Sequence, residues 1–581
     1  MAESKTSTTN AEQLITEHLD IWTTAIEQKS SSGRGSSKKF SLHGIKKLRE
    51  LILELAVRGK LVPQNPNDEP ASELLERIAA EKAQLVKDKK IKKPKALPEI
   101  SDEEKPFELP ESWEWVRFPD TSYYGPGKTP STKNTDFWAE NSSGIPWVSI
   151  ADLNDVGYVS ETNKQVTQLA KTDIFKSEPV PKGTLLMSFK LTVGKVSFLE
   201  MPAFHNEAII SIFPYSGVSK EYLFRVLPNR ANKGNKKNAI MGFTLNSESL
   251  SLLVVPIPPE KEQHRIVAKV DELMSLCDAL EAQTENSITA HQTLVEVLLE
   301  ALLKAPEQGA TPEQTAEHFQ QNWQRLSDHF DTLFTTTASI DTLKQTILQL
   351  AVMGKLVPQN PNDEPAAKLL ERIAAEKAQL IKDKKIKKQK PLPEITDEEK
   401  LFNKPESWIF RRFGDVMFNR DGERKPVSAD LRKGMQGQYD YYGASGVIDR
   451  VNDYLFDKSL LLIGEDGANL ISRSTPIAFL AHGKYWVNNH AHVLDGINID
   501  FLKFVALHIN AISLEDYITG TAQPKMNQAK MNSIVLVIPP EAEQQRIVAK
   551  VDELMALCDQ LKARLTDAQT TKLHLTDAIV E

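Results

Sequence analysis

The sequence of 581 residues has no long apolar run and only two cysteines. No stretch approaches the roughly 18 apolar residues of a membrane-spanning helix, and the N-terminal MAESKTSTTNAEQ lacks the apolar core of a signal peptide. We therefore expect a cytoplasmic protein that does not associate with a membrane. A disulfide or a metal site stays open for Cys277 and Cys558, but we expect both to be small buried hydrophobic residues.

Motifs of catalysis are also missing. GPGKT at residues 125–129 looks like a phosphate-binding loop, but that motif requires a glycine where Ser122 stands. No GxGxxG follows a predicted strand, and the Asn/Asp-Pro-Pro-aromatic tetrapeptide of amino-methyltransferases is absent. His490 and His492 have a spacing that metal ions accept, but no further ligands are evident nearby, so a structural or hydrogen-bonding role is expected. We expect neither a catalytic nor a metal site in this chain.

What the sequence does contain is a long repeated segment. IPPEKEQHRIVAKVDELMSLCD at Ile257–Asp278 returns as IPPEAEQQRIVAKVDELMALCD at Ile538–Asp559. Apolar residues recur in it at a spacing of four, three, four and three, which predicts a coiled-coil seam on a helix. Because a seam needs a partner, we expect the two copies to pair or to dock partner proteins. The seam residues are Ile266, Val270, Leu273, Cys277 and Leu280 in the first copy and Ile547, Val551, Leu554, Cys558 and Leu561 in the second.

The repeat extends to a second block. Residues Gly59–Ala71 return identically as Gly354–Ala366, and PESW at Pro110–Trp113 returns at Pro405–Trp408. Such identity within one chain indicates an internal duplication. The segments between the repeats differ: short apolar runs separated by turn residues predict strand-rich domains of unlike sequence. The predicted order is a helical block at 1–109, a variable domain at 110–257, a helical region at 258–404, a second variable domain at 405–538 and a helix at 539–581.

Helix boundaries can be placed from local signals. We predict an amphipathic helix over Ala11–Gln28, a helix that ends near Arg58 with Gly59 as its cap, and a helix from about Pro70 to Lys87. A long helix is expected from Glu260 to about Leu303. TPEQ, beginning at Thr311, is a capping box with proline at the first helical position, and two helices are expected from there to Met353.

The whole chain carries 71 basic and 79 acidic residues, so positive charge can predominate only in local segments. This net charge of −8 argues mildly against a free-standing nucleic-acid binder. Six lysines follow the helix that ends near Lys87, and the run recurs from Lys382 to Lys390. A solvated helix end is the simpler interpretation of this lysine run. Phosphate contact or docking onto an acidic partner is the alternative.

Both variable domains contain clusters of basic, amide and aromatic residues, which suit contacts to phosphates and base edges. An isolated surface lysine usually has no such role, so the clusters carry the prediction. The candidates in the first domain are Tyr123, Tyr124, Lys190, Lys195, Asn206, Arg225, Arg230, Lys233, Lys236 and Lys237. Those in the second domain are Arg420, Arg424, Lys425, Tyr441, Tyr442, Asn488, Asn489, His490 and Lys525.

The duplicated IPPxxEQxRIVAKVDEL frame around two unlike domains resembles the specificity subunit of type I restriction-modification enzymes. The LVPQNPNDEPA block makes it most similar to the IB branch. This resemblance covers nearly the whole chain. It implies two target recognition domains on double-stranded DNA, each reading half of a bipartite, asymmetric site, with helices that dock two modification subunits. It also implies that S-adenosylmethionine, ATP and magnesium belong to the modification and motor-nuclease partners, and that this chain is non-catalytic and has no cofactor.

The expected fold is α+β: two strand-rich recognition domains separated by an antiparallel pair of long coiled-coil-like helices with internal pseudo-twofold symmetry. Domains arranged in this way can face major grooves about one turn apart, ~34 Å or ~10 bp. If each reads ~3–4 bp, an unread spacer of roughly 6–7 bp remains.

Two other classes of protein are alternatives for this sequence. The first is an enzyme that carries its own methyltransferase or nuclease domain, and binding of S-adenosylmethionine to the isolated chain would support it. The second is a coiled-coil scaffold without a DNA role. The seams are short and interrupted by two large variable domains, which a scaffold would not need.

Overall fold

The computed structural model describes residues 11–28, 40–93, 96–140, 143–190, 192–233, 237–239, 242–244, 247–304, 311–400, 402–520 and 523–580. The chain divides into two compact units. Unit 1 comprises Met1–Asn286 together with Gln569–Glu581, and unit 2 comprises Ser287–Ala568. Two long helices, α8 (Glu260–Leu303) and α18 (Glu541–Val580), contribute segments to both units. The expected helix from Glu260 to Leu303 is confirmed to the residue.

Unit 1 begins with a helical block. Its elements are α1 (Ala11–Glu17), α2 (Leu19–Thr24), β1 (Glu27–Gln28), β2 (Phe40–Ser41), α3 (His43–Val57), α4 (Ala71–Lys87) and η1 (Asp102–Glu104). The single helix predicted over Ala11–Gln28 is wrong, because His18 leaves the helical region with φ −114° and ψ 22° and the segment ends in β1. The indole of Trp22 is fully buried and donates to the Ile15 carbonyl at 3.1 Å across this break.

Helix α3 ends as its sequence predicts. Gly59 has φ +68°, and the Lys60 amide donates to the Leu55 carbonyl at 2.9 Å, which is the hydrogen bond that closes a Schellman cap. A Cβ at Gly59 would lie 2.5 Å from Pro110 Cγ, so this glycine is needed for close approach as well as for its backbone angle. In unit 2, Gly354 repeats the cap with φ +71° and the same 2.5 Å approach to Pro405.

The first strand-rich domain, β-domain 1, spans residues 114–257. A five-stranded sheet has the order β4-β12-β9-β10-β7, a four-stranded sheet has the order β11-β6-β8-β5, and β3 and β15 form an antiparallel pair. Strands β9 and β10 pair antiparallel. The strands are β3 (Glu114–Arg117), β4 (Ser122–Pro126), β5 (Trp138–Ala139), β6 (Ile145–Val148), β7 (Val156–Val159), β8 (Lys164–Val166), β9 (Leu185–Ser188), β10 (Val196–Leu199), β11 (Phe204–His205), β12 (Ile209–Pro214), β13 (Lys237–Ala239), β14 (Gly242–Thr244) and β15 (Val254–Ile257).

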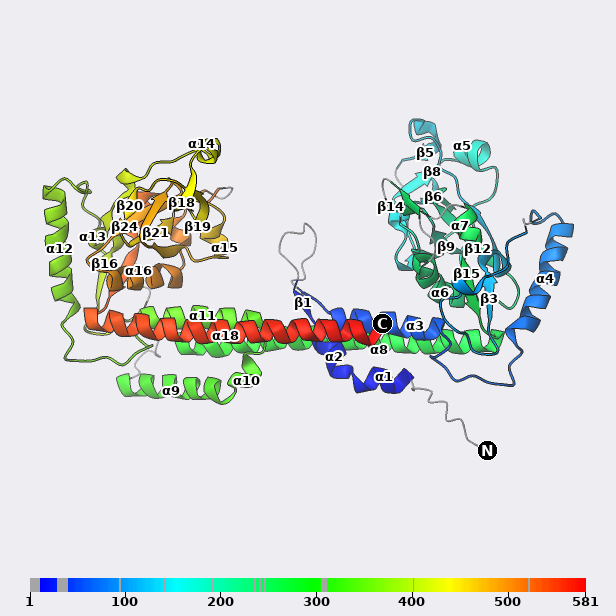
Figure 1. Ribbon diagram of the computed structural model, residues 1–581, viewed down its shortest axis with the longest axis horizontal. Helices are drawn as coiled ribbons and strands as arrows, with labels where there is room; N and C mark the ends of the chain where they lie inside the picture. Colours follow the sequence, from blue (N-terminus) through cyan, green and yellow to red (C-terminus); the bar gives the residue numbers. More distant parts are fainter. Residues whose placement is uncertain are drawn as a thin grey trace. The chain divides into compact units, whose positions relative to one another are not determined.

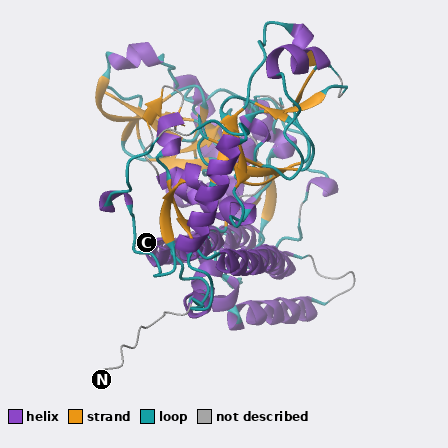
Figure 2. Cartoon of the chain, turned by 90° about the vertical axis from the view of Figure 1, so that its right-hand side faces the viewer, coloured by secondary structure: helices purple, strands orange, loops and turns teal. Residues whose placement is uncertain are grey.

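β-domain 1 also contains helical segments. They are η2 (Phe118–Asp120), η3 (Thr135–Phe137), η4 (Ile150–Asp152), α5 (Gln168–Ala170), η5 (Lys171–Phe175), α6 (Lys220–Lys233) and α7 (Ser247–Ser251). Helix α6 packs against α3, β10 and β15, which joins β-domain 1 to the helical block. Strands gather in the β-domains and long helices below them, as the colours of Figure 2 show.

Unit 2 repeats this plan. Its helical block contains α9 (Pro312–Asp328), α10 (Phe330–Leu333), α11 (Thr337–Val352), α12 (Ala366–Lys382) and η6 (Asp397–Glu399). The capping box at Thr311 is confirmed, since its side chain accepts from the Gln314 amide. Three helices, rather than the two expected, lie between Thr311 and Met353.

The second strand-rich domain, β-domain 2, spans residues 409–538. Its two four-stranded sheets have the orders β17-β24-β21-β22 and β19-β18-β23-β20, and β16 pairs with β25 as β3 pairs with β15. The strands are β16 (Ile409–Arg412), β17 (Phe418–Asn419), β18 (Gln436–Gly443), β19 (Gly446–Val451), β20 (Phe456–Asp457), β21 (Leu460–Gly464), β22 (Ala478–Ala481), β23 (Lys484–Val487), β24 (Ala491–Asp495) and β25 (Val535–Ile538). The helical segments are α13 (Phe413–Val416), η7 (Asp421–Glu423), α14 (Ala429–Lys433), α15 (Asn469–Ser472), α16 (Ile499–Ala511), η8 (Glu515–Tyr517) and α17 (Gln528–Ser533).

Within unit 2 the long helices run antiparallel. Near the start of α11, Asp341 pairs with Lys562 and Lys344 with Asp559, so α11 and α18 run in opposite directions. Helix α8 runs with α11, because His291 lies beside the Leu333 carbonyl before α11 and Lys355 reaches the Leu302 carbonyl after it. The antiparallel arrangement predicted for the two long helices is therefore confirmed in this unit (Figure 1).

A repeated set of polar contacts joins the helical block of each unit to its long helix and to the first strand of its β-domain. In unit 1, Arg265 of α8 pairs with Asp68 at 2.7 Å, and in unit 2 Arg546 of α18 pairs with Asp363 at 2.6 Å. The loop residues and the helices that make these contacts form the frame of each unit. Four further contacts recur at matching positions: Arg77–Glu260 with Arg372–Glu541, Gln64–Glu262 with Gln359–Glu543, Arg49–Asp278 with Lys344–Asp559, and Arg117–Glu104 with Arg412–Glu399.

Candidate nucleic-acid interface

Strand β4 of β-domain 1 carries two candidate aromatic residues on opposite faces. Tyr123 is 41% exposed and stacks on Phe213 of the neighbouring strand β12, with ring centroids 4.9 Å apart. Tyr124 stacks on Phe118, and burial raises the pKa of its hydroxyl to about 12. The exposed ring of Tyr123 is therefore the one available to a base or sugar, and Tyr124 supports the sheet.

The polar candidates near the β9–β10 hairpin are only partly exposed. Lys190 lies with its Nζ 5.1 Å from the Phe189 ring, and Lys195 donates to the Leu153 carbonyl at 3.0 Å. Asn206 uses its side-chain oxygen to accept from the Ala208 amide at 2.6 Å, which leaves its amide group for other contacts. All three lie at the surface of β-domain 1, so they stay candidates.

Two basic candidates on helix α6, Arg225 and Arg230, bond groups of their own unit. Arg230 is only 4% exposed, donates to the Val254 carbonyl at 3.1 Å and lies 5.1 Å from the Trp115 ring, and burial lowers the pKa of its guanidinium. Arg225 pairs with Asp271 of α8. In this structure both side chains join α6 to its own unit; the buried Arg230 is not available to DNA, whereas the partly exposed Arg225 stays a candidate. Lys236 lies outside the described residues, as do the side chains of Lys233 and Lys237.

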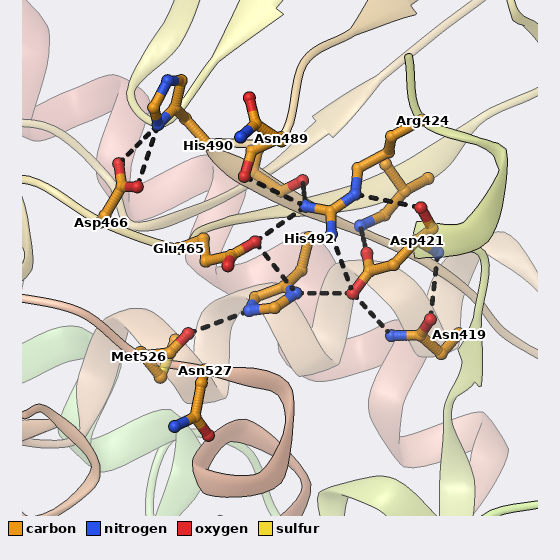
Figure 3. A network of polar contacts seen from close by, with 12 residues as sticks. Asn419, Asp421, Arg424, Glu465, Asp466, Asn489, His490, His492, Met526 and Asn527 are labelled. Carbon is orange, nitrogen blue, oxygen red and sulfur yellow. Dashed lines mark hydrogen bonds and ion pairs between the residues drawn. The ribbon is translucent and has the colours of Figure 1, made fainter. Parts of the chain in front are cut away.

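The candidate Arg424 in β-domain 2 belongs to a partly buried charged network (Figure 3). Its guanidinium donates to Glu465 at 2.9 Å and to the Ala491 carbonyl at 2.6 Å. His492 is 1% exposed, with Nδ1 at 2.7 Å from Asp421 and Nε2 at 3.0 Å from the Met526 carbonyl. Burial acts to raise the pKa of the Asp421 carboxyl, but the hydrogen bond and charge of His492 and the charge of Arg424 outweigh it, so this pKa lies below its ordinary value.

Several other candidates in β-domain 2 are also committed to internal contacts. Tyr441 is 1% exposed and its hydroxyl bonds the backbone of Val427, while Asn488 is 4% exposed and accepts from the His490 amide at 2.8 Å. Arg420 pairs with Glu423 and with Asp495, and Tyr442 packs against Tyr485. Tyr441 and Asn488 are thus buried within the domain, whereas Arg420 and Tyr442 are partly exposed and stay candidates.

An exposed group remains around the charged network. Asn489 has no side-chain partner among the described residues, and His490 is half-exposed with Nδ1 at 2.9 Å from Asp466. Lys525 is half-exposed and pairs with Glu465 at 3.2 Å, and Lys425 is exposed. Arg424 and Glu465 of the buried network also bond residues of this exposed group. The structure thus brings the candidates of three separate sequence segments to one surface of β-domain 2.

The seam residues lie in both units. In unit 1, Ile266, Val270, Leu273 and Cys277 are buried. In unit 2, Ile547, Val551 and Cys558 are buried in one cluster with Leu343 and Ile347 of α11, with Leu299 of α8 and with Trp408, and the partly buried Leu554 and Leu561 pack against it. Leu280 is only partly buried. The described neighbours of the second copy thus come from α11, the end of α8 and β-domain 2, which differs from the direct pairing of one copy with the other that we expected.

The comparisons with known proteins fit these observations. Residues 110–290 and 405–568, together more than half of the chain, match the family described as type I restriction modification DNA specificity domain. The specificity subunits of the type I restriction enzymes EcoAI and EcoEI, both from Escherichia coli, are 40% and 39% identical to this chain and each covers 98% of it and 99% of its own length. The chain belongs to the type I restriction-modification specificity subunit family.

A solved structure titled "Structural basis underlying complex assembly and conformational transition of the type I R-M system" includes a chain that covers 82% of this specificity subunit and 98% of its own length, at 14% identity and a TM-score of 0.43. This score is too low to support an argument about geometry. The sequence relatives identify the chain as a DNA-specificity subunit, which is a non-catalytic role in such a system.

Sequence reasoning missed the acidic half of the network in this specificity subunit. Glu465 pairs with Arg424 at 2.9 Å and with Lys525 at 3.2 Å, Asp466 lies 2.9 Å from His490, and Asp421 lies 2.7 Å from His492. Asp421 belongs to η7, Glu465 and Asp466 directly follow β21, and His492 lies in β24; no local pattern in the sequence indicates that they meet. In the described parts of the chain, no group of three or more His, Cys, Asp and Glu side chains is arranged to hold a metal ion. None of the described helices is long and apolar enough to span a membrane.

Proposed function

We propose that this specificity subunit reads a bipartite, asymmetric site in double-stranded DNA, with one β-domain on each half. The repeated frame carries this proposal. Five polar contacts recur at matching positions in the two units, from Arg265–Asp68 and Arg546–Asp363 to Arg117–Glu104 and Arg412–Glu399. One frame therefore presents two domains of unlike sequence, which suits two different half-sites.

The exposed candidates supply the chemistry for base and phosphate contacts. In β-domain 1 they are Tyr123, Lys190, Lys195 and Asn206, and in β-domain 2 they are Lys425, Asn489, His490 and Lys525. An amide such as that of Asn489 can bond an adenine edge with two hydrogen bonds, and lysines bond guanine or phosphate oxygens. Because the two sets differ, we expect the two half-sites to differ.

The helices supply the second part of the proposal. We infer that α8 and α18 set the distance between the half-sites and dock two modification subunits, one for each copy of the frame. Motor-nuclease subunits complete the assembly in the cytoplasm, and S-adenosylmethionine, ATP and magnesium bind to these partners. The LVPQNPNDEPA blocks at 61–71 and 356–366 favour the IB branch.

Mapping of methylated adenines tests this proposal. The chain is co-expressed with its cognate modification subunits, and a single bipartite, non-palindromic motif with a fixed spacer is expected. Asn489→Ala should change or relax only the half-site of β-domain 2. The matched variant Asn452→Ala changes an amide elsewhere in the same domain and should leave the motif intact. A stable complex on DNA that yields no bipartite motif would contradict the proposal.

The enzyme alternative is tested separately. Equilibrium binding of S-adenosylmethionine to the purified chain alone should be undetectable. Specific binding at micromolar concentration would revive that alternative.

A further inference from the structure

We propose that two matching lysine runs contact the phosphate backbone of DNA, each next to the half-site that its β-domain reads. The runs are residues 87–93 at the end of α4 in unit 1 and residues 382–390 at the end of α12 in unit 2. This inference rests on the proposed function. It assigns a sequence-independent DNA contact to the frame itself, apart from the recognition surfaces of the β-domains.

The two runs have the same backbone conformation. Lys89 and Lys384 both occupy the left-handed region, with φ of 56° and 57°. The next amides, those of Lys90 and Lys385, donate to the Leu85 and Leu380 carbonyls, both at 2.9 Å. The left-handed region favours glycine or asparagine after a helix, yet lysine stands there in both copies. Positive charge thus occupies a position where the backbone alone would favour another residue.

The charge of these runs is available. Lys87, Lys90 and Lys92 are exposed, and in the part of the chain that the structure describes no lysine side chain of either run makes an ion pair or a hydrogen bond. The arginines of the β-domains differ, since Arg424 and Arg230 are tied to internal acceptors. A lysine without an internal partner can release counterions from a phosphate, whereas a paired arginine must first break its ion pair. The exposed lysines of the runs are Lys87, Lys89, Lys90, Lys92 and Lys93, and Lys382, Lys384, Lys385, Lys387, Lys388 and Lys390.

The surroundings of the runs favour nucleic acid over a protein partner. Protein interfaces are built around buried aromatic or aliphatic anchors, and lysine is depleted in them. No large apolar side chain is exposed within residues 82–93 or 377–390. Lysine is a point charge on a flexible stem, which suits phosphate oxygens.

In unit 1 the run adjoins a candidate recognition surface. A groove of about 1040 Å³ is lined by Lys90 and Lys92 on one side and by Tyr123 and Tyr124 of strand β4 on another. A strand that contacts the exposed ring of Tyr123 can therefore continue toward the lysines. Helix α4 is held to the same domain by Lys82, whose Nζ pairs with Asp120 at 2.7 Å.

Repetition decides what the runs can read. The β-domains differ because each reads different bases, but both runs contain the same KDKKIKK sequence and the same turn. A feature that is the same in both units suits a target that is the same at both half-sites. In DNA of any sequence this is the phosphate backbone.

The experiment measures the salt dependence of DNA binding by the assembled complex with its modification subunits. The probe is a duplex that contains the motif found by methylation mapping, and a second duplex has both half-sites scrambled. The test variant is Lys92→Gln with Lys387→Gln. Since each lost phosphate contact lowers the slope of log K against log salt by about 0.9, we expect a slope less steep by about 1.8 and an unchanged ratio of affinities for the two duplexes.

The matched control changes two other lysines of the same frame. Lys105→Gln with Lys400→Gln removes the same charge, but these lysines already pair with Asp102 and Asp397, so the slope should stay that of the native complex. Lys92→Arg with Lys387→Arg should restore the native slope.

Three results would overturn the inference. They are a native slope for the test variant, an equal change in the control, and failure of the test variant to assemble with the modification subunits before DNA is added. The last result would show that the runs dock the partner. If the native complex binds both duplexes equally, the proposed function fails, and the comparison of slopes still decides the role of the lysines.

Discussion

The guanidinium of Arg412 donates two hydrogen bonds to the carboxylate of Glu399, from Nη1 to Oε1 at 2.6 Å and from Nη2 to Oε2 at 2.8 Å. Arg117 and Glu104 repeat this pair in unit 1 at 2.6 and 3.0 Å. Each arginine is the last residue of the first strand of a β-domain. Each glutamate is the last residue of the short helix, η1 or η6, that precedes this strand. The pair therefore fixes where a β-domain leaves its frame.

Replacement of Arg412 should destabilise unit 2. The side chain is 4% exposed and also donates to the carbonyls of Pro393, Glu394 and Ser533. Arg412→Met leaves these acceptors without a donor, so we expect a loss of about 2–4 kcal/mol in the free energy of unfolding. Urea denaturation of the chain measures it. Arg411→Met is the matched control, because Arg411 is exposed on the same strand, and its effect should stay within about 0.5 kcal/mol. Equal effects would show that the buried position of Arg412 does not matter.

The same pair predicts a pH dependence of stability. The hydrogen bond from Arg412 lowers the pKa of the Glu399 carboxyl to about 2, from an ordinary value of 4.5. A group whose pKa is lower in the folded state binds fewer protons there, so it stabilises the fold above pH 4.5 and loses this contribution as the pH falls toward 2. The stability difference between native chain and Glu399→Gln should therefore shrink over this range. Glu398→Gln, an exposed neighbour, should show no such trend, and a constant difference for Glu399→Gln would contradict the assignment.

A structural feature can be predicted from the sequence when the residues that determine it lie close together along the chain. The long helix from Glu260 to Leu303, the cap at Gly59 and the capping box at Thr311 rest on residues within a few positions of one another, and all three are confirmed. The break at His18 was missed, because the apolar spacing of the segment continues through it.

The recognition surfaces depend on contacts that are distant in sequence. Arg230 and Arg424 were candidates for DNA contact because the sequence around an arginine does not show whether its side chain is exposed or buried in the fold. Their acceptors, Val254 and Glu465, lie 24 and 41 residues away, and only the fold brings them together. Exposed candidates such as Asn489 need no partner within the chain, and their contact with DNA stays a prediction.

His492 should be important for stability, and its neighbour His490 for DNA binding. The His492 ring is buried with an acceptor at each nitrogen, so His492→Leu leaves Asp421 and the Met526 carbonyl without these contacts. We expect a loss of about 3 kcal/mol in the free energy of unfolding. His490→Leu removes a half-exposed side chain and should change stability by no more than about 0.5 kcal/mol while weakening binding to the native motif. Denaturation and DNA titration of both variants decide this, and the reverse pattern would refute the division of roles.

The length of the long helices should set the spacer. Insertion of seven residues after Asn286 in α8 and after Ala568 in α18 keeps the seam in register, because seven residues are one heptad. The insertion adds about 10 Å to each helix at 1.5 Å per residue, which corresponds to about 3 bp of DNA. We therefore expect a methylation motif with the same half-sites and a spacer longer by about 3 bp. Asn489→Ala serves as the converse control, since it should alter a half-site and leave the spacer as it is. Changed half-sites with an unchanged spacer in the insertion variant would show that the helices do not set the distance between the two recognition events.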